Sequence, residues 1–150
     1  MNVGELCIRE VVITEKDSSI RQVARLMREY HVGDVIVVEE MNNDCIPVGI
    51  ITDRDIAIEL IAEDVDLNTI TVGDAMSFDL LTALEEDDIF TLIERMQVKG
   101  VRRVPVVNAN GGLEGIISVD DLIDVFSEQM VNFVKLFFRG RDYERKYRDT

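Results

Sequence analysis

Cysteine, histidine and basic side chains are all scarce in this chain of 150 residues. The two cysteines, Cys7 and Cys45, do not stand in a CxxC or another metal-binding spacing, and His31 is the single histidine. A lone histidine at the end of an expected helix is usually a cap or a surface residue. Two isolated cysteines without a secretion signal are typical of a reducing compartment. These shortages argue against a cysteine-based metal site and predict a cytoplasmic protein.

The shortage of basic residues leaves a formal net charge of −14. The charge is uneven, because residues 1–134 hold 27 acidic and 10 basic side chains, while residues 135–150 hold 3 acidic and 6 basic ones. Such an acidic body repels nucleic acid and anionic membranes. The chain also lacks a run of about 18 or more apolar residues and a basic start like that of a signal peptide. We therefore expect a soluble protein that binds neither nucleic acid nor membrane.

Motifs of catalysis are missing as well. There is no Walker loop, no GxGxxG, and no serine or cysteine with a plausible partner base. The acidic residues 85–88 come where a helix is expected to begin, and negative charge there complements the helix dipole. We therefore expect a binding protein and not an enzyme, with no metal and no catalytic residues.

What the sequence does contain is a duplication. Residues 49–56, Gly-Ile-Ile-Thr-Asp-Arg-Asp-Ile, return at 115–122 as Gly-Ile-Ile-Ser-Val-Asp-Asp-Leu. Upstream, Val-Gly-Glu at 3–5 recurs as Val-Gly-Asp at 72–74, an offset of 69 residues. The offset then falls to 66, so the first copy has three extra residues in a loop within 39–48. Each half alone would be marginally stable, so we expect the halves to share a core, packed face to face.

Each copy is predicted to fold as strand, helix, strand, strand, helix. For the first copy, the predicted elements are a strand at 11–13, a helix capped at 17–19 and ending near Tyr30, strands at 35–38 and 48–51 joined by a loop at 39–47, and a helix from Asp53 or Asp55 through Ile56, Ile58 and Ile61. For the second copy, they are a strand at 80–83, a helix from 87–88 through Met96, strands at 104–107 and 113–117 joined by an Asn-Gly-Gly turn at 110–112, and a helix from Asp120.

The repeated motif pairs a hydroxyl residue with an aspartate three positions later, Thr52 with Asp55 and Ser118 with Asp121. Two interpretations are open. The pair is either a capping box at the start of a helix, or a nucleotide seat. In a seat, the free helix amides and the hydroxyl bind phosphate, and the carboxylate accepts hydrogen bonds from ribose. Duplication of the whole arrangement favours the second interpretation.

These motifs resemble a tandem pair of cystathionine-β-synthase (CBS) domains, a Bateman module of the small stand-alone bacterial or archaeal type. The resemblance rests on residues 49–56, 72–76, 101–107 and 115–122 and covers about residues 3–126. It implies an α/β fold of two β-α-β-β-α repeats packed through their sheets with pseudo-two-fold symmetry. We expect repeats at 1–64 and 65–126, with a C-terminal amphipathic helix and basic tail at 127–150.

The resemblance also implies a function. Such modules bind adenosine-containing ligands (AMP, ADP, ATP, S-adenosylmethionine or NAD(H)) between the repeats and act as sensors for a partner protein, here unknown. Thr52, Asp55, Ser118 and Asp121 would hold phosphate and ribose. The adenine would lie beside Val12, Ile13, Val35, Ile36, Thr82, Ala83, Val104 and Pro105. The alternative is a constitutive dimerisation scaffold whose ligand sites are vestigial.

The two copies differ in charge just before their central strands. The second copy has Arg102 and Arg103, where the first has Gly33 and Asp34. Arginine forks suit phosphate on so acidic a surface, whereas Asp34 would repel a phosphate beside it. Alternatively, the two arginines simply pair with nearby acids. If they are phosphate ligands, one cleft should dominate.

The segment beyond the repeats carries a stripe of phenylalanines on one side of a helix, including Phe126, Phe133 and Phe137, followed by a basic end. An exposed stripe of this kind is a liability, so we expect the body or a second chain to cover it. A homodimer is therefore predicted.

Overall fold

The structure is a computed structural model that describes residues 1–148, so residues 149–150 of the predicted tail lie outside it. The chain divides into two compact units, Met1–Ile117 and Ser118–Thr150. The elements follow in the order α1 (Val3–Leu6), β1 (Ile13–Glu15), α2 (Ile20–Tyr30), β2 (Asp34–Met41), β3 (Asp44–Thr52), the π-helix η1 (Asp55–Ile61), α3 (Val72–Ala75), β4 (Ala83–Leu84), α4 (Ile89–Lys99), β5 (Arg103–Val107), β6 (Leu113–Ser118) and α5 (Val119–Arg148).

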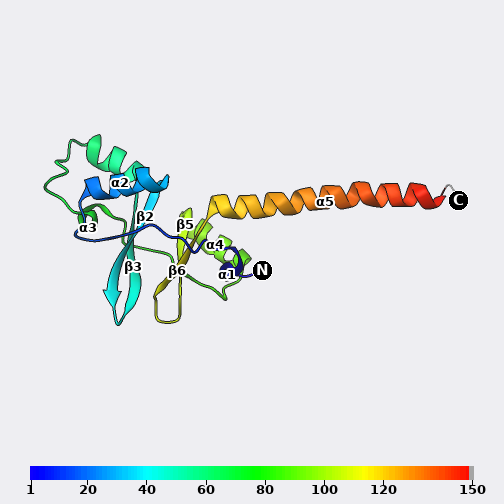
Figure 1. Cartoon of the computed structure of the whole chain (residues 1–150), viewed down its shortest axis with the longest axis horizontal. Coiled ribbons are helices and arrows are strands. Elements are labelled where there is room, and N and C mark those ends of the chain that lie inside the picture. Colours follow the sequence, from blue (N-terminus) through cyan, green and yellow to red (C-terminus); the bar gives the residue numbers. More distant parts are fainter. Residues whose placement is uncertain (149–150) are drawn as a thin grey trace. The chain divides into compact units, whose positions relative to one another are not determined.

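The predicted α/β fold is confirmed. Within residues 1–148 there are two three-stranded sheets, ordered β1-β2-β3 and β4-β5-β6 (Figure 1). In each sheet the first strand runs parallel to the central one, and β2 and β3 form an antiparallel hairpin. The duplication in the sequence is thus a duplication of sheets.

The core of the first repeat lies between its sheet and its helices. Ile20, Val23 and Met27 recur at helical spacing, and all three are buried on one face of α2. The β-branched centre of β2, residues 35–38, is buried throughout because both of its faces are covered. In the second repeat, α4 buries Ile89, Leu92 and Met96 in the same way.

The repeats exchange their first helices. Helix α3 lies at the start of the second repeat, yet it docks on the first, where the amides of Val72 and Gly73 donate to the carbonyls of Ser18 and Lys16 at 2.9 and 2.8 Å. Val72 is fully buried in the core of the first repeat. Figure 1 shows α3 beside α2 accordingly.

Helix α1 makes the reciprocal contact with the second repeat. The amides of Val3 and Gly4 donate to the carbonyls of Asp87 and Glu85 at 3.0 and 2.8 Å. Each repeat therefore contributes its first helix to the other one, as expected of halves that share a core.

The glycines that open the repeated motif lie where these exchanged segments cross the sheets. The Ile50 amide donates to the Ser77 carbonyl at 2.9 Å, and a Cβ on Gly49 would lie 3.0 Å from that same oxygen. In the other copy Ile8 bridges to Ile116, and a Cβ on Gly115 would lie 2.8 Å from the Ile8 carbonyl oxygen. Only glycine leaves room for the crossing backbone at either place.

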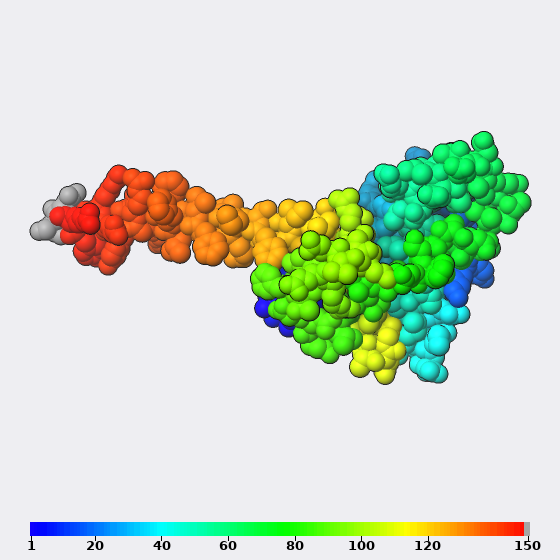
Figure 2. All heavy atoms as spheres, turned by 180° about the vertical axis from the view of Figure 1, so that it is seen from behind, coloured from blue at the N-terminus to red at the C-terminus, as the bar shows by residue number. Residues whose placement is uncertain are grey.

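The tips of the two hairpins lie side by side, cyan for β2–β3 and yellow for β5–β6 (Figures 1 and 2). A Cβ on Gly112 would lie 2.9 Å from an oxygen of the Asp44 carboxylate. The loop predicted at 39–47 is wrong, because the strands continue to a tight turn at Asn42 and Asn43, both with positive φ. The three extra residues of the first copy therefore lengthen a hairpin and do not form a loop.

Three other element predictions need correction. The strands predicted at 11–13 and 80–83 begin later, at Ile13 and Ala83, because pairing with the central strands begins there. The helix after β3 is a π-helix that buries Ile56 and Leu60, while Ile58 and Ile61 are exposed.

The acidic run at 85–88 has the structural role predicted, because Asp88 caps α4 by accepting from the Thr91 amide at 3.0 Å.

Helix α5 is a single helix of 30 residues. Along this helix Phe133, Phe137 and Phe138 are 65%, 63% and 56% exposed. Over the described residues, no helix is both long and apolar enough to cross a membrane.

Replacing Gly49 or Gly115 by alanine should lower the free energy of unfolding by about 1–3 kcal/mol, because the added Cβ meets a carbonyl oxygen held by the inter-repeat bridge. Urea unfolding measures this change. Gly140→Ala is the control, since nothing lies within 4 Å of its added Cβ. Equal stability of all three variants would show that the crossing backbone segments shift to accommodate the added Cβ without cost.

Candidate functional site

Both copies of the hydroxyl-aspartate motif form capping boxes. The amide of Thr52 donates to Asp55 Oδ2 at 3.0 Å, and the amide of Asp55 donates to Thr52 Oγ1 at 3.1 Å. In the second copy Ser118 and Asp121 make the same pair of bonds at 3.0 and 3.2 Å, and the Ser118 hydroxyl also donates to Asp121 Oδ2 at 2.7 Å. The capping interpretation is thus correct as local geometry. Only Oδ2 of each aspartate takes part in the box.

A cleft of about 420 Å³ opens at the first of these motifs. One wall comes from the first repeat, with Thr52 at the end of β3 and Arg54 just before η1. The other wall comes from the second repeat. The complete lining is Gly33, Ile50, Thr52, Asp53, Arg54, Ser77, Asp79, Leu80, Leu81, Val101, Arg102 and Arg103. Its volume falls within the range of about 300–1,000 Å³ that is usual for small-molecule sites.

Cations from both repeats line this cleft. Arg54 and Arg102 are both exposed, and within residues 1–148 no ion pair of either side chain is found at 4.0 Å or less. Lys99, which also precedes the central strand, is held by Asp79 at 2.6 Å. Two guanidinium groups therefore face the cleft without a carboxylate bound to them.

Arg103 is engaged differently. Its Nε lies 2.7 Å from Oδ1 of Asp34, whose side chain is only 13% exposed. The two residues occupy equivalent positions in the repeats, 69 residues apart, so the copies meet there through opposite charges. For Arg103, the interpretation that it pairs with a nearby acid is correct in this structure. Asp34 thereby holds a guanidinium at the edge of the cleft.

The remaining predicted site residues lie elsewhere. Val12 and Ile13 line a separate hollow of about 470 Å³ beside α2. The Thr82 carbonyl accepts a hydrogen bond from Arg95 at 2.9 Å. Asp55 does not line the cleft. The strand residues Val35, Ile36, Ala83, Val104 and Pro105 are buried within the sheets.

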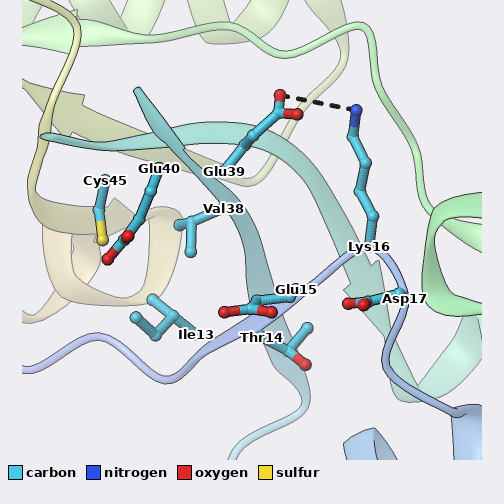
Figure 3. A pocket seen from close by; sticks show the side chains of 9 residues that line it. All are labelled: Ile13, Thr14, Glu15, Lys16, Asp17, Val38, Glu39, Glu40 and Cys45. Carbon is cyan, nitrogen blue, oxygen red and sulfur yellow. Dashed lines mark ion pairs between the residues drawn. The ribbon is translucent and has the colours of Figure 1, made fainter. Parts of the chain in front are cut away.

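A further hollow, of about 530 Å³, has the wrong charge for a nucleotide. Figure 3 shows it at β1 and the β2–β3 hairpin, where Lys16 points toward Glu39 with their charged atoms 3.7 Å apart. Glu15, Asp17 and Glu40 complete an acidic lining. A phosphate would be repelled here, so the smaller cleft at Thr52 is the better candidate.

Some of the cleft residues escaped the sequence prediction. Arg54 stands inside the quoted motif, and an arginine between the hydroxyl and the aspartate was the signal available for it. Leu80 was missed as well, and it corresponds to Val11 at the offset of 69 residues. The contribution of Ser77 depends on the exchange of α3, which no local pattern indicates.

Two groups near α1 have shifted pKa values. Burial raises the pKa of the Cys7 thiol, and a hydrogen bond from Arg9 to Glu85 raises the pKa of Arg9. Both residues contact the second repeat near α1, away from the cleft lining. Among residues 1–148 there is also no group of three or more His, Cys, Asp or Glu side chains placed to hold a metal.

The capping geometry makes one stability prediction. Asp55→Ala should lower the free energy of unfolding by about 1 kcal/mol, because the Thr52 amide loses its acceptor. Asp55→Asn keeps an oxygen acceptor and should lose less. Chemical denaturation of the two variants checks this, and identical losses would mean that the carboxylate charge, not the cap, stabilises η1.

Comparisons with known proteins agree with this architecture. The CBS domain family matches twice, over residues 3–62 and 72–128. An uncharacterized protein of Methanopyrus kandleri, MK0525, is 32% identical over 125 residues, which are 83% of this chain and 62% of that protein, so the chain spans less than two thirds of that relative. Hypoxic response protein 1 of Mycobacterium tuberculosis is 30% identical over 90% of this chain and 88% of its own length.

A solved structure extends the comparison to a ligand complex. The CBS domain protein PAE2072 from Pyrobaculum aerophilum, complexed with AMP, aligns with a TM-score of 0.72 and 30% identity. The alignment covers 81% of this chain and 90% of that one.

Proposed function

Since this chain belongs to the CBS domain family, we propose that it is a regulatory module that binds an adenosine nucleotide in the Thr52 cleft. AMP, ADP and ATP are the ligands that the charge of the cleft favours. S-adenosylmethionine and NAD(H) are further members of the same chemical class. The AMP complex of PAE2072 supports the class of ligand.

The observation that carries the proposal is the meeting of Thr52 with two unpaired arginines in one cleft. Thr52 contributes a hydroxyl beside the first turn of η1. Arg54 and Arg102 contribute guanidinium groups, which bind phosphate through two parallel hydrogen bonds. On a body of strongly negative charge, a phosphate needs such local cations to overcome the surrounding field.

The apolar part of the same lining suits a base. Ile50, Leu80, Leu81 and Val101 line the cleft together with the arginines. A nucleobase is flat and largely apolar on its faces, so it would lie against these side chains while the phosphate meets Arg54 and Arg102. Asp55, which does not line the cleft, would act indirectly by holding Thr52 through the capping box.

The position of the cleft suggests how binding is read out. Its walls belong to different repeats. Ile50 and Ser77, which are bridged to each other across the repeats, both line it. A ligand that contacts both walls stabilises one arrangement of the repeats by its difference in affinity for the two states. The regulated partner would sense that arrangement, and the module itself would not transform the nucleotide.

One structural observation favours the alternative of a constitutive scaffold. The motif hydroxyls and aspartates are already hydrogen-bonded to one another, and Asp34 already neutralises Arg103. Thermal melting distinguishes the two functions, because a ligand at about 100 times its dissociation constant adds about 2.7 kcal/mol to stability. No shift with any adenosine ligand would favour the scaffold, and turnover of nucleotide by the pure protein would contradict both functions.

Replacing Arg102 or Arg54 by alanine should weaken AMP binding by roughly 10- to 150-fold, the loss of a charge-assisted contact of about 1.5–3 kcal/mol. Adenosine, which lacks the phosphate, should lose little affinity. Arg25→Ala is the matched control, because it removes the same charge from the exposed surface of α2. Calorimetry with both ligands gives the comparison. Equal losses of affinity for AMP and adenosine would show that these arginines do not bind the phosphate.

Asp34→Ala should strengthen AMP binding, because it frees the Arg103 guanidinium and removes a negative charge beside the cleft. Raising the salt concentration should reduce this gain, since the added attraction is electrostatic. The double variant Asp34→Ala/Arg103→Ala separates the two causes. If Asp34→Ala instead abolishes AMP binding while the protein still melts cooperatively, the Asp34–Arg103 ion pair holds the site in its binding geometry and does not weaken binding.

A further inference from the structure

Helix α5 carries an apolar stripe that nothing within its own length covers. Ile123, Phe126, Met130, Phe133 and Phe137 follow one another at alternating spacings of three and four residues, which places them on one face. Four of the five are 56–65% exposed, and Phe126 is half-buried. The stripe is about 21 Å long at 1.5 Å per residue.

The charges of α5 divide into two opposite halves. Residues 119–134 carry four acidic side chains and no basic one, while residues 135–148 carry six basic and two acidic ones. The helix dipole favours this polarity only within the first and last turns. Asp124, Glu128, Lys135 and Arg139 lie further inside, so the dipole does not account for the division.

Together these features make α5 complementary to itself in one orientation. In a parallel pair, acidic half would face acidic half and basic would face basic. In an antiparallel pair whose apolar stripes overlap around Met130, residues 119–125, with three acidic side chains, lie along residues 135–141 of the other copy, with three basic ones and no acidic one. A two-fold axis relates such copies, so one surface serves both.

We propose that two copies of this chain associate through an antiparallel pairing of their α5 helices. The stripe supplies the buried contact, and the divided charge selects the orientation. Other occupants fit less well. An anionic lipid surface would be repelled by residues 119–134, and a membrane-spanning role does not suit any helix within the described residues.

Spin labels on α5 test the orientation directly in the full-length chain. In a background of Cys7→Ala and Cys45→Ala, single labels are attached at Asn132→Cys, near the middle of the helix, or at Arg145→Cys, near its end. An antiparallel pair that overlaps around Met130 gives a short distance at residue 132 and about 45 Å at residue 145, since residue 145 lies 15 positions from Met130 on each helix. A parallel pair gives short distances at both, because paired helix axes lie about 8–10 Å apart.

Sedimentation tests whether the stripe holds the copies together. Phe133→Ser/Phe137→Ser should weaken the dimer by at least about 100-fold. Phe78→Ser, outside α5 and 79% exposed, is the control and should leave the dimer intact. Salt should weaken the wild-type dimer, because opposite charges face each other.

Four results would overturn the proposal. They are a wild-type monomer at high micromolar concentration, an unweakened Phe133→Ser/Phe137→Ser dimer, short label distances at both positions, and no short distance at residue 132. A monomer that binds anionic vesicles would assign the stripe to a lipid surface instead.

Discussion

The close crossing of exchanged backbone over each sheet is the constraint on which the rest of the body depends. Helix α3 and the segment behind it complete the first repeat, and α1 completes the second. Neither crossing has room for a side chain, so Gly49 and Gly115 are fixed by the backbone that passes over them. The cleft at Thr52 exists because this crossing brings Ser77 and Asp79 of one repeat against β3 of the other.

Much of the fold could be predicted from the sequence because its signals are local. The face of α2 buried through Ile20, Val23 and Met27 and the buried run at 35–38 were readable as periodicity. The exchange of α1 and α3 was not, because it depends on hydrogen bonds between residues 54–84 positions apart in the chain. Strand ends were also misplaced, since pairing partners decide where a strand begins.

The candidate site was predictable in its motif and less so in its cations. Thr52 was expected at the end of a strand and lies there, lining the cleft. The two arginines expected in the site have different roles, because Arg102 faces the cleft and Arg103 is bound to Asp34. Arg54 takes the second place instead, and a linear motif could not show that it faces a residue 48 positions away.

The pairing of Asp34 with Arg103 has a consequence for how the two halves of the chain recognise each other. Because the residues occupy equivalent positions, two first repeats brought together would face aspartate with aspartate, and two second repeats arginine with arginine. Either association would bring like charges together at a partly buried position. The halves have therefore ceased to be interchangeable, and during folding each repeat is directed to its unlike neighbour in the same chain rather than to its own counterpart in another.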